Sequence, residues 1–145
     1  MLLWYNFDIN IASKPEWCYK DIIMTHIFLG VVIMKFAIIG SRGLLVEDLE
    51  NYIPDGVEEI VSGGAKGIDA CAKNYAIKSG KKLTEFLPDY GRYKKGAPLV
   101  RNMQIVEYAD EVLAFWDGKS RGTKFVIDKC ILLGKKINVV VLNKQ

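Results

Sequence analysis

The chain alternates short apolar runs, most of them followed by glycine or a polar residue, with longer segments in which apolar residues recur at helical spacing. Short runs that are apolar throughout are typical of strands buried on both faces of a parallel sheet. They predict strands at 36–39, 59–61, 83–87, 111–116 and 137–142, and helices at 44–53, 68–79, 100–109 and 124–133. The polar and aromatic segment 88–98 is expected to be a loop.

Strands that alternate with helices predict a parallel sheet with right-handed crossovers. We therefore expect an α/β fold: a Rossmann-like three-layer sandwich, with a mostly parallel sheet of about five strands and helices on both faces. In such a sheet the carboxyl ends of the strands lie along one edge, where loops far apart in the sequence come together.

Residues 1–33 do not share this pattern. Their apolar stretch at 22–33 is interrupted by Thr25 and His26, and it is shorter than the roughly 20 apolar residues of a membrane span. We expect 1–33 to be an N-terminal extension of uncertain role and 34–145 to be the functional domain. The alternatives for the extension are an added strand or helix at the sheet edge, or a membrane anchor.

Composition narrows the function classes. The net charge of the 145 residues is only +3, whereas a dedicated nucleic-acid binder usually has a denser basic stripe. Cys18, Cys71 and Cys130 have no metal-ligand spacing, and the single histidine, His26, lies outside the domain. We expect a cytoplasmic protein with reduced thiols, no metal, no required cofactor and no membrane contact, and the sequence leaves homo-oligomer formation open.

Glycine-rich loops follow three of the predicted strands. Glycines let backbone N–H groups approach a ligand, and helix N-termini attract anions. We therefore expect the three loops to bind a phosphate-bearing ligand, a nucleotide or a derivative of one. The residues concerned are Gly40, Ser41, Arg42, Ser62, Gly63, Gly64, Ala65, Lys66, Gly67, Asp117, Gly118, Ser120, Arg121, Gly122 and Thr123.

Charged residues in the first two loops add to this expectation. Arg42 suits bidentate phosphate recognition, and Lys66 places a positive charge beside the start of a helix. A surface salt bridge is the alternative role for Arg42. Asp69 lies in the first turn of the next helix, where it either orients the loop or contacts a ribose hydroxyl.

The third loop allows two interpretations as well. Ser120 or Thr123 is a suitable N-cap for the helix that follows, while the cations at 119 and 121 favour an anion site. Asp117 either holds the loop through backbone N–H groups or contacts a sugar. Trp116, directly before it, is a core residue or a stacking platform.

Two further segments are candidates for ligand contact. Arg101 and Asn102 lie near the start of a helix and are expected to face a phosphate or to take part in catalysis. The loop segment 90–95 combines tyrosines with basic residues, and it is either a flap that stacks on a base or an exposed loop without a role.

Taken together, the motifs resemble the SLOG superfamily, which groups the DNA-processing protein A fold with the Lonely Guy phosphoribohydrolases. The YspA-like, cpYpsA-related branch is the most similar. The resemblance covers about 34–142 and rests on segments 39–42, 61–69, 101–102 and 114–123. It implies a Rossmann-like fold that binds nucleotides or nucleotide-derived ligands, and the related phosphoribohydrolases have an arginine in the place of Arg101.

One position departs from the family pattern. The Lonely Guy enzymes have a catalytic glutamate three residues after a Gly-Thr pair, whereas Val126 follows Gly122 and Thr123 at that distance. We therefore favour a sensor or sequestering module that binds the ligand without cleaving it. The alternatives are a phosphoribohydrolase of nucleoside monophosphates, with Arg101, Asp69 or Asp117 as catalytic candidates, and binding of single-stranded DNA.

Overall fold

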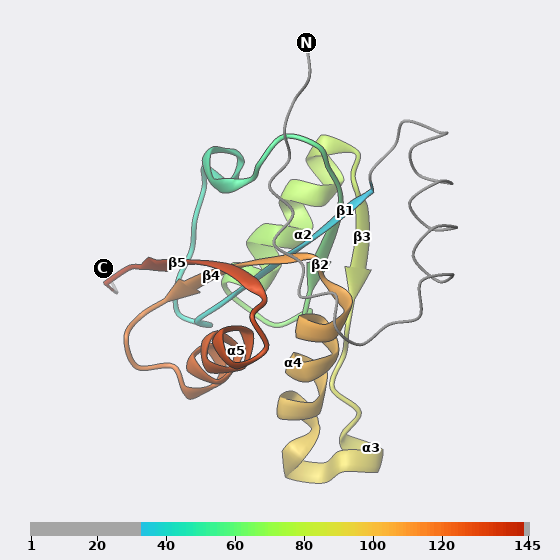
Figure 1. The fold of residues 1–145 in the computed structure, drawn as a ribbon, viewed down its shortest axis with the longest axis vertical. Coiled ribbons are helices and arrows are strands. Elements are labelled where there is room, and N and C mark those ends of the chain that lie inside the picture. Colours follow the sequence, from blue (N-terminus) through green and yellow to red (C-terminus); the bar gives the residue numbers. More distant parts are fainter. Residues whose placement is uncertain (1–32, 144–145) are drawn as a thin grey trace. The chain divides into compact units, whose positions relative to one another are not determined.

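The structure, a computed structural model, describes residues 33–143 (Figure 1). Ile33–Gln145 forms one unit of the chain. The predicted extension at 1–33 lies, apart from Ile33, outside the described residues. The strands are β1 (Met34–Gly40), β2 (Val57–Ser62), β3 (Lys82–Glu85), β4 (Glu111–Trp116) and β5 (Lys136–Val141). The helical elements are η1 (Leu49–Tyr52), α2 (Ile68–Ser79), α3 (Tyr90–Tyr93), η2 (Lys94–Gly96), α4 (Ala97–Tyr108) and α5 (Arg121–Leu132).

The five strands form one parallel sheet in the order β3-β2-β1-β4-β5. The chain builds the sheet outward from β1, first in one direction through β2 and β3 and then in the other through β4 and β5. The direction of winding therefore reverses between β1 and β4. In sheets of this kind, ligands bind outside the carboxyl ends of the strands at that reversal.

Both faces of the sheet are covered by helices, which confirms the predicted three-layer sandwich. Along β1, Phe36 and Ile38 belong to one core, and Ala37 and Ile39 to the other. α2 and η1 pack over the first face, and α4 and α5 over the second, as Figure 1 shows. Burial of each Phe or Ile side chain contributes about 2 kcal/mol to the free energy of folding.

Several elements have the boundaries that the sequence predicts. α2 spans Ile68–Ser79 and β4 spans Glu111–Trp116, as expected. Gly80 ends α2 in the left-handed conformation, with φ 66° and ψ 20°. The segment 88–98, predicted to be a loop, instead contains the short helical turns α3 and η2 and the first two residues of α4.

The predicted helix at 44–53 is wrong. Only the 3-10 turn η1 forms there, because Leu44 and Leu49 are the buried residues of this segment, whereas Leu45 is 77% exposed. Two anchors five positions apart do not lie on one helical face. The segment still ends where expected: Ile53 is extended ahead of Pro54, because proline disfavours helical geometry at the residue before it.

A buried carboxylate, which the sequence analysis did not single out, joins β2, β3 and α4. The side chain of Glu59 is 3% exposed and accepts hydrogen bonds from Thr84 Oγ1 at 2.7 Å, Tyr108 Oη at 2.8 Å and Lys82 Nζ at 2.9 Å. Burial acts to raise the pKa of Glu59, but these hydrogen bonds outweigh it, so that the pKa lies below its ordinary value of 4.5.

Glu59→Gln is expected to lower the free energy of unfolding by about 2 kcal/mol at neutral pH, because charge-assisted hydrogen bonds are lost. A lowered pKa in the folded state stabilises the protein above the unfolded value of 4.5, and this contribution disappears as the pH falls through the folded pKa. Urea unfolding from pH 7 to pH 3 should show the two proteins converging at acid pH. Glu58→Gln, at an exposed neighbour on the same strand, is the control and should match wild type throughout. A constant difference between Glu59→Gln and wild type across this range would contradict the assignment.

Candidate functional site

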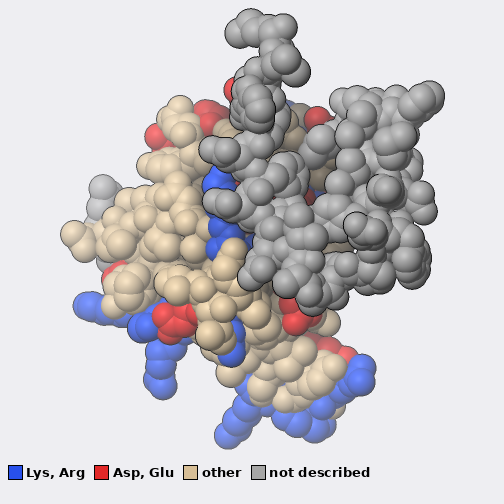
Figure 2. All heavy atoms as spheres, viewed as in Figure 1, with Lys and Arg blue, Asp and Glu red and all other residues tan. Residues whose placement is uncertain are grey.

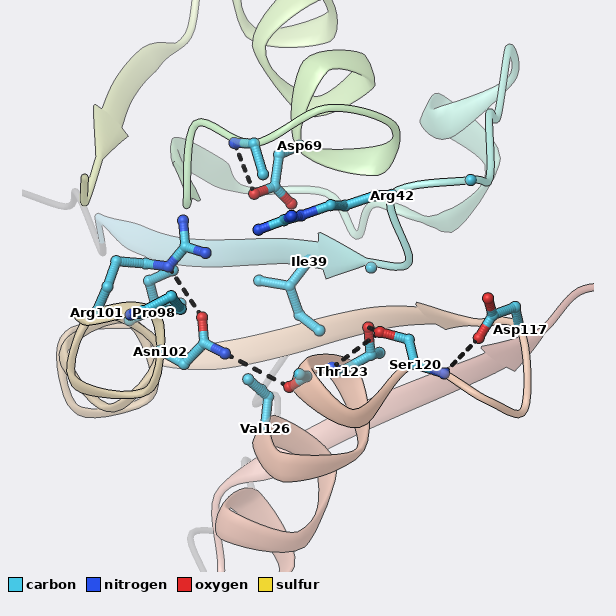
Figure 3. Close-up of a pocket in the computed structure, with 15 residues that line it drawn as sticks. Ile39, Arg42, Asp69, Pro98, Arg101, Asn102, Asp117, Ser120, Thr123 and Val126 are labelled. Carbon is cyan, nitrogen blue, oxygen red and sulfur yellow. Dashed lines mark hydrogen bonds between the residues drawn. The ribbon is translucent and has the colours of Figure 1, made fainter. Parts of the chain in front are cut away.

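A pocket of about 360 Å³ lies beyond the carboxyl ends of β1 and β4, at the point where the winding of the sheet reverses (Figure 3). All three glycine-rich loops, together with α4, contribute to it. The predicted site residues that line it are Gly40, Arg42, Ala65, Asp69, Arg101, Asn102, Asp117, Ser120, Gly122 and Thr123. The convergence expected from a parallel sheet is therefore present.

A second hollow of about 370 Å³ adjoins this pocket. Gly63, Gly64 and Lys66 of the second loop line it together with Pro88 and Tyr90. Arg42, Ala65 and Arg101 line both hollows. The two spaces therefore open onto the same pair of guanidinium groups.

Arg101 projects from α4 and is only 7% exposed. Its Nη1 donates a hydrogen bond to the carbonyl oxygen of Gly63, and its Nε donates to Asn102 Oδ1 at 2.9 Å. Burial lowers the pKa of Arg101, Asp69 opposes this effect, and the nearby charge of Arg42 adds to it. In Figure 3 the guanidinium groups of Arg42 and Arg101 extend toward one another from opposite sides of the pocket.

Gly63 provides the space that Arg101 occupies. A Cβ at this position would overlap Nη1 of Arg101 and lie 2.6 Å from its Cζ. The predicted reason for this glycine was the approach of a phosphate to the backbone. In the structure, an arginine side chain makes that close approach.

Asp69, at the start of α2, is 5% exposed and holds the second loop in place. Its Oδ2 accepts a hydrogen bond from the backbone N–H of Ala65 at 3.1 Å. Burial raises the pKa of Asp69, although the Ala65 amide and the charge of Arg101 act in the opposite direction. The loop-orienting role is therefore present. Contact with a ribose hydroxyl stays a prediction, for which Asp69 is suitably placed in the wall of the pocket.

Asp117 organises the third loop. Its Oδ1 accepts hydrogen bonds from the backbone N–H groups of Ser120 at 2.7 Å and Lys119 at 3.0 Å. Ser120 caps α5, accepting from the N–H of Thr123 at 3.5 Å, and Trp116 Nε1 donates to the Ser120 carbonyl at 3.1 Å. The expected capping and loop-holding contacts are therefore both made, and Trp116 supports the loop from a half-buried position.

Asn102 connects the second and third loops through α4. It accepts from Arg101 Nε, and its Nδ2 donates to the Gly122 carbonyl at 3.4 Å. A continuous chain of hydrogen bonds therefore runs from Gly63 through Arg101 and Asn102 to Gly122. This chain connects the second and third loops through two neighbouring side chains of α4.

The remaining predicted residues line neither hollow. Ser41 and Ser62 are buried: Ser41 Oγ accepts from the N–H of Asp117 at 3.2 Å, and Ser62 Oγ accepts from the N–H of Gly64 at 3.4 Å. Gly67 packs against the backbone of Arg42. Gly118 and Arg121 are exposed.

Apolar side chains complete the pocket, and apart from Val126 the sequence analysis did not assign them to it. Ile39, Ile105 and Pro98 line the pocket together with Val126, which is 1% exposed. Val126 follows Thr123 by about one helical turn on α5, so the two side chains face the same space. The position where the resembled enzymes have a glutamate is therefore in the pocket wall, and it is apolar.

Comparisons with known proteins found no relative of this chain. No family model, curated protein or solved structure matches the chain. The resemblance to the SLOG superfamily therefore stays a prediction from the motifs alone. Among residues 33–143, no helix has the length and apolar character needed to cross a membrane, and no three His, Cys, Asp or Glu side chains lie together as metal ligands would.

Proposed function

We propose that the pocket binds a nucleotide or nucleotide-derived ligand through its phosphate group, as a sensor or sequestering module. The observation that carries this proposal is the pair of arginines. The buried guanidinium group of Arg101 lies near that of Arg42, which is exposed, and the carboxylate of Asp69 is close enough to act on both. Bringing like charges together in a desolvated site is unfavourable, and a bound anion removes the cost.

Further features support a nucleotide rather than a bare anion. The lining combines hydrogen-bonding side chains, among them Asn102, Ser120 and Thr123, with the apolar side chains of α4 and α5. Small-molecule sites combine a largely apolar lining with a few convergent polar groups in this way. The SLOG resemblance implies the same class of ligand.

Binding without cleavage is favoured because Val126 is apolar and buried. The carboxylates that line the pocket are Asp69 and Asp117, and both accept hydrogen bonds from loop amides. Cleavage of a glycosidic bond requires a carboxylate positioned at the reacting carbon or at water. In this site the acids support the loops instead.

A thermal-shift screen against nucleoside mono-, di- and triphosphates, followed by titration calorimetry, tests the binding proposal. A ligand at 100 times its Kd stabilises the folded state by about 2.7 kcal/mol, which raises the Tm measurably. Inorganic phosphate and a single-stranded oligonucleotide belong in the same screen. Tight binding of the oligonucleotide without any response to nucleotides would overturn the proposal in favour of nucleic-acid binding.

The wild-type protein is expected to release no free base from nucleoside monophosphates above the buffer background. Chromatography after prolonged incubation with each common monophosphate measures this. The raised pKa and pocket position of Asp69 make it the residue to test if turnover is seen. Turnover that Asp69→Asn abolishes, with the fold intact, would instead identify an N-glycosidic hydrolase with a relocated acid.

A further inference from the structure

Two hollows of nearly equal size flank one pair of cations. The volumes are about 360 Å³ and 370 Å³. Each alone is near the lower limit of roughly 300–1,000 Å³ for small-molecule sites, while both together lie well inside that range. Because Arg42, Ala65 and Arg101 belong to both linings, an anion at the arginines would face a cavity on either side.

The two hollows differ in chemistry. The first offers carboxylate, amide and hydroxyl groups from Asp69, Asn102 and Thr123, which suit a group rich in hydroxyls such as a ribose. The second has no carboxylate in its lining, but it has a third cation, Lys66, and the side chains of Pro88 and Tyr90. Tyr90 is 54% exposed, so its ring is accessible for stacking on a planar base.

The positive charge also extends beyond the second hollow. α3 and η2 place Arg92, Lys94 and Lys95 on the surface next to Tyr90 in sequence, and Figure 2 shows Lys and Arg side chains gathered at the end of the molecule where α3 lies. A ligand with a single phosphate would need only the two arginines. The second hollow is lined by three cations, Arg42, Lys66 and Arg101. They favour more than one negative charge at the centre of the ligand.

We infer that the ligand is two-armed: two groups, at least one of them a nucleoside, joined by a pyrophosphate that lies between Arg42 and Arg101, with one arm in each hollow. The inference rests on the proposed function, since it requires that the arginine pair binds phosphate. It excludes a simple nucleoside mono- or diphosphate as the best ligand, because such a compound would leave one hollow empty.

Titration calorimetry with matched probes tests the inference. The probes are a nucleoside monophosphate, the diphosphate and the symmetric dinucleoside diphosphate, in adenosine, guanosine and uridine series. In at least one series the two-armed compound should bind about ten-fold or more tightly than the diphosphate, with one molecule per chain, because a second stacked base is gained. Equal affinity, or two monophosphates bound per chain with no gain from linkage, would overturn the inference and leave the proposed function standing. No binding in any series would overturn both.

Tyr90→Ala separates the second arm from the first. It should remove most of the advantage of the two-armed compound over the diphosphate, and Tyr90→Phe should restore the advantage because it keeps the aromatic ring. Tyr93→Ala, in the same short helix but outside both linings, is the matched control and should behave as wild type. A two-armed ligand that loses no affinity in Tyr90→Ala contradicts the placement of its second arm.

Discussion

Arg101→Met is expected to weaken nucleotide binding by about 100-fold or more, which corresponds to about 2.7 kcal/mol. Arg101 lines both hollows and is held in place by Gly63 and Asn102, so its charge is pre-oriented toward the ligand. Methionine keeps an unbranched apolar stem but removes the charge and the planar donors. Titration calorimetry with the best ligand of the screen measures the loss.

Two companion variants show whether the loss of affinity is specific to Arg101 and whether it comes from the charge or from the planar donors. Arg92→Met removes an exposed arginine from α3, outside both linings, and should change the affinity by less than two-fold at 0.15 M salt. Arg101→Lys keeps the charge but not the fork of donors, and should fall between wild type and Arg101→Met. Wild-type affinity in Arg101→Met, with an intact fold, would contradict the proposed phosphate site.

Gly67→Ala is expected to lower the free energy of unfolding by about 3 kcal/mol and the Tm by about 10 °C. Gly67 has φ 77° and ψ −125°, a conformation that side chains with Cβ rarely adopt. In addition, the new Cβ would lie 2.6 Å from the carbonyl oxygen of Arg42, which is backbone and has little freedom to move. Ligand affinity should fall as well, because the displaced loop carries one of the two arginines.

Gly80→Ala is the companion variant, at a glycine with a milder left-handed conformation and no close contact. Gly80 also has a positive φ, of 66°, but nothing lies within 4 Å of the position that a Cβ would take. It should therefore show only the conformational cost, about 1 kcal/mol, and unchanged ligand affinity. Equal destabilisation in thermal and urea unfolding of the two variants would show that the contact with the Arg42 backbone contributes nothing.

The sequence predicted the position of the site better than its internal contacts. Parallel strands bring their carboxyl ends to one edge, so three glycine-rich loops after three such strands had to converge, whatever the details of the helices. α2 was predicted to the residue because Ala72 and Ala76 pack on the sheet and Gly80 ends the helix. The helix expected at 44–53 was wrong because the apolar residues that suggested it include Leu45, which is exposed, so periodicity alone does not distinguish a helix from an irregular segment with two buried anchors.

The role of Gly63 could not be read from the sequence. Its neighbour in space, Arg101, is 38 positions away in the chain, and only the packing of α4 on the sheet brings them together. The chain of hydrogen bonds through Asn102 likewise joins residues that only the tertiary fold brings together. Local patterns indicate which residues suit a phosphate, whereas tertiary contacts decide which of them support the loops and which face the cavity.

The strand order has a consequence for how the protein is made. β1 is the central strand, yet on one side its neighbour is β4, and the contact that starts this pairing, Lys35 N–H to Asp110 Oδ2, joins residues 75 positions apart. During synthesis this edge of β1 is therefore unpaired until β4 has left the ribosome, and neither hollow has its complete lining before α4 is added. Contacts of such long range slow folding and prolong the exposure of unpaired strands. We expect the nascent chain, rather than the finished domain, to be the form most dependent on chaperones.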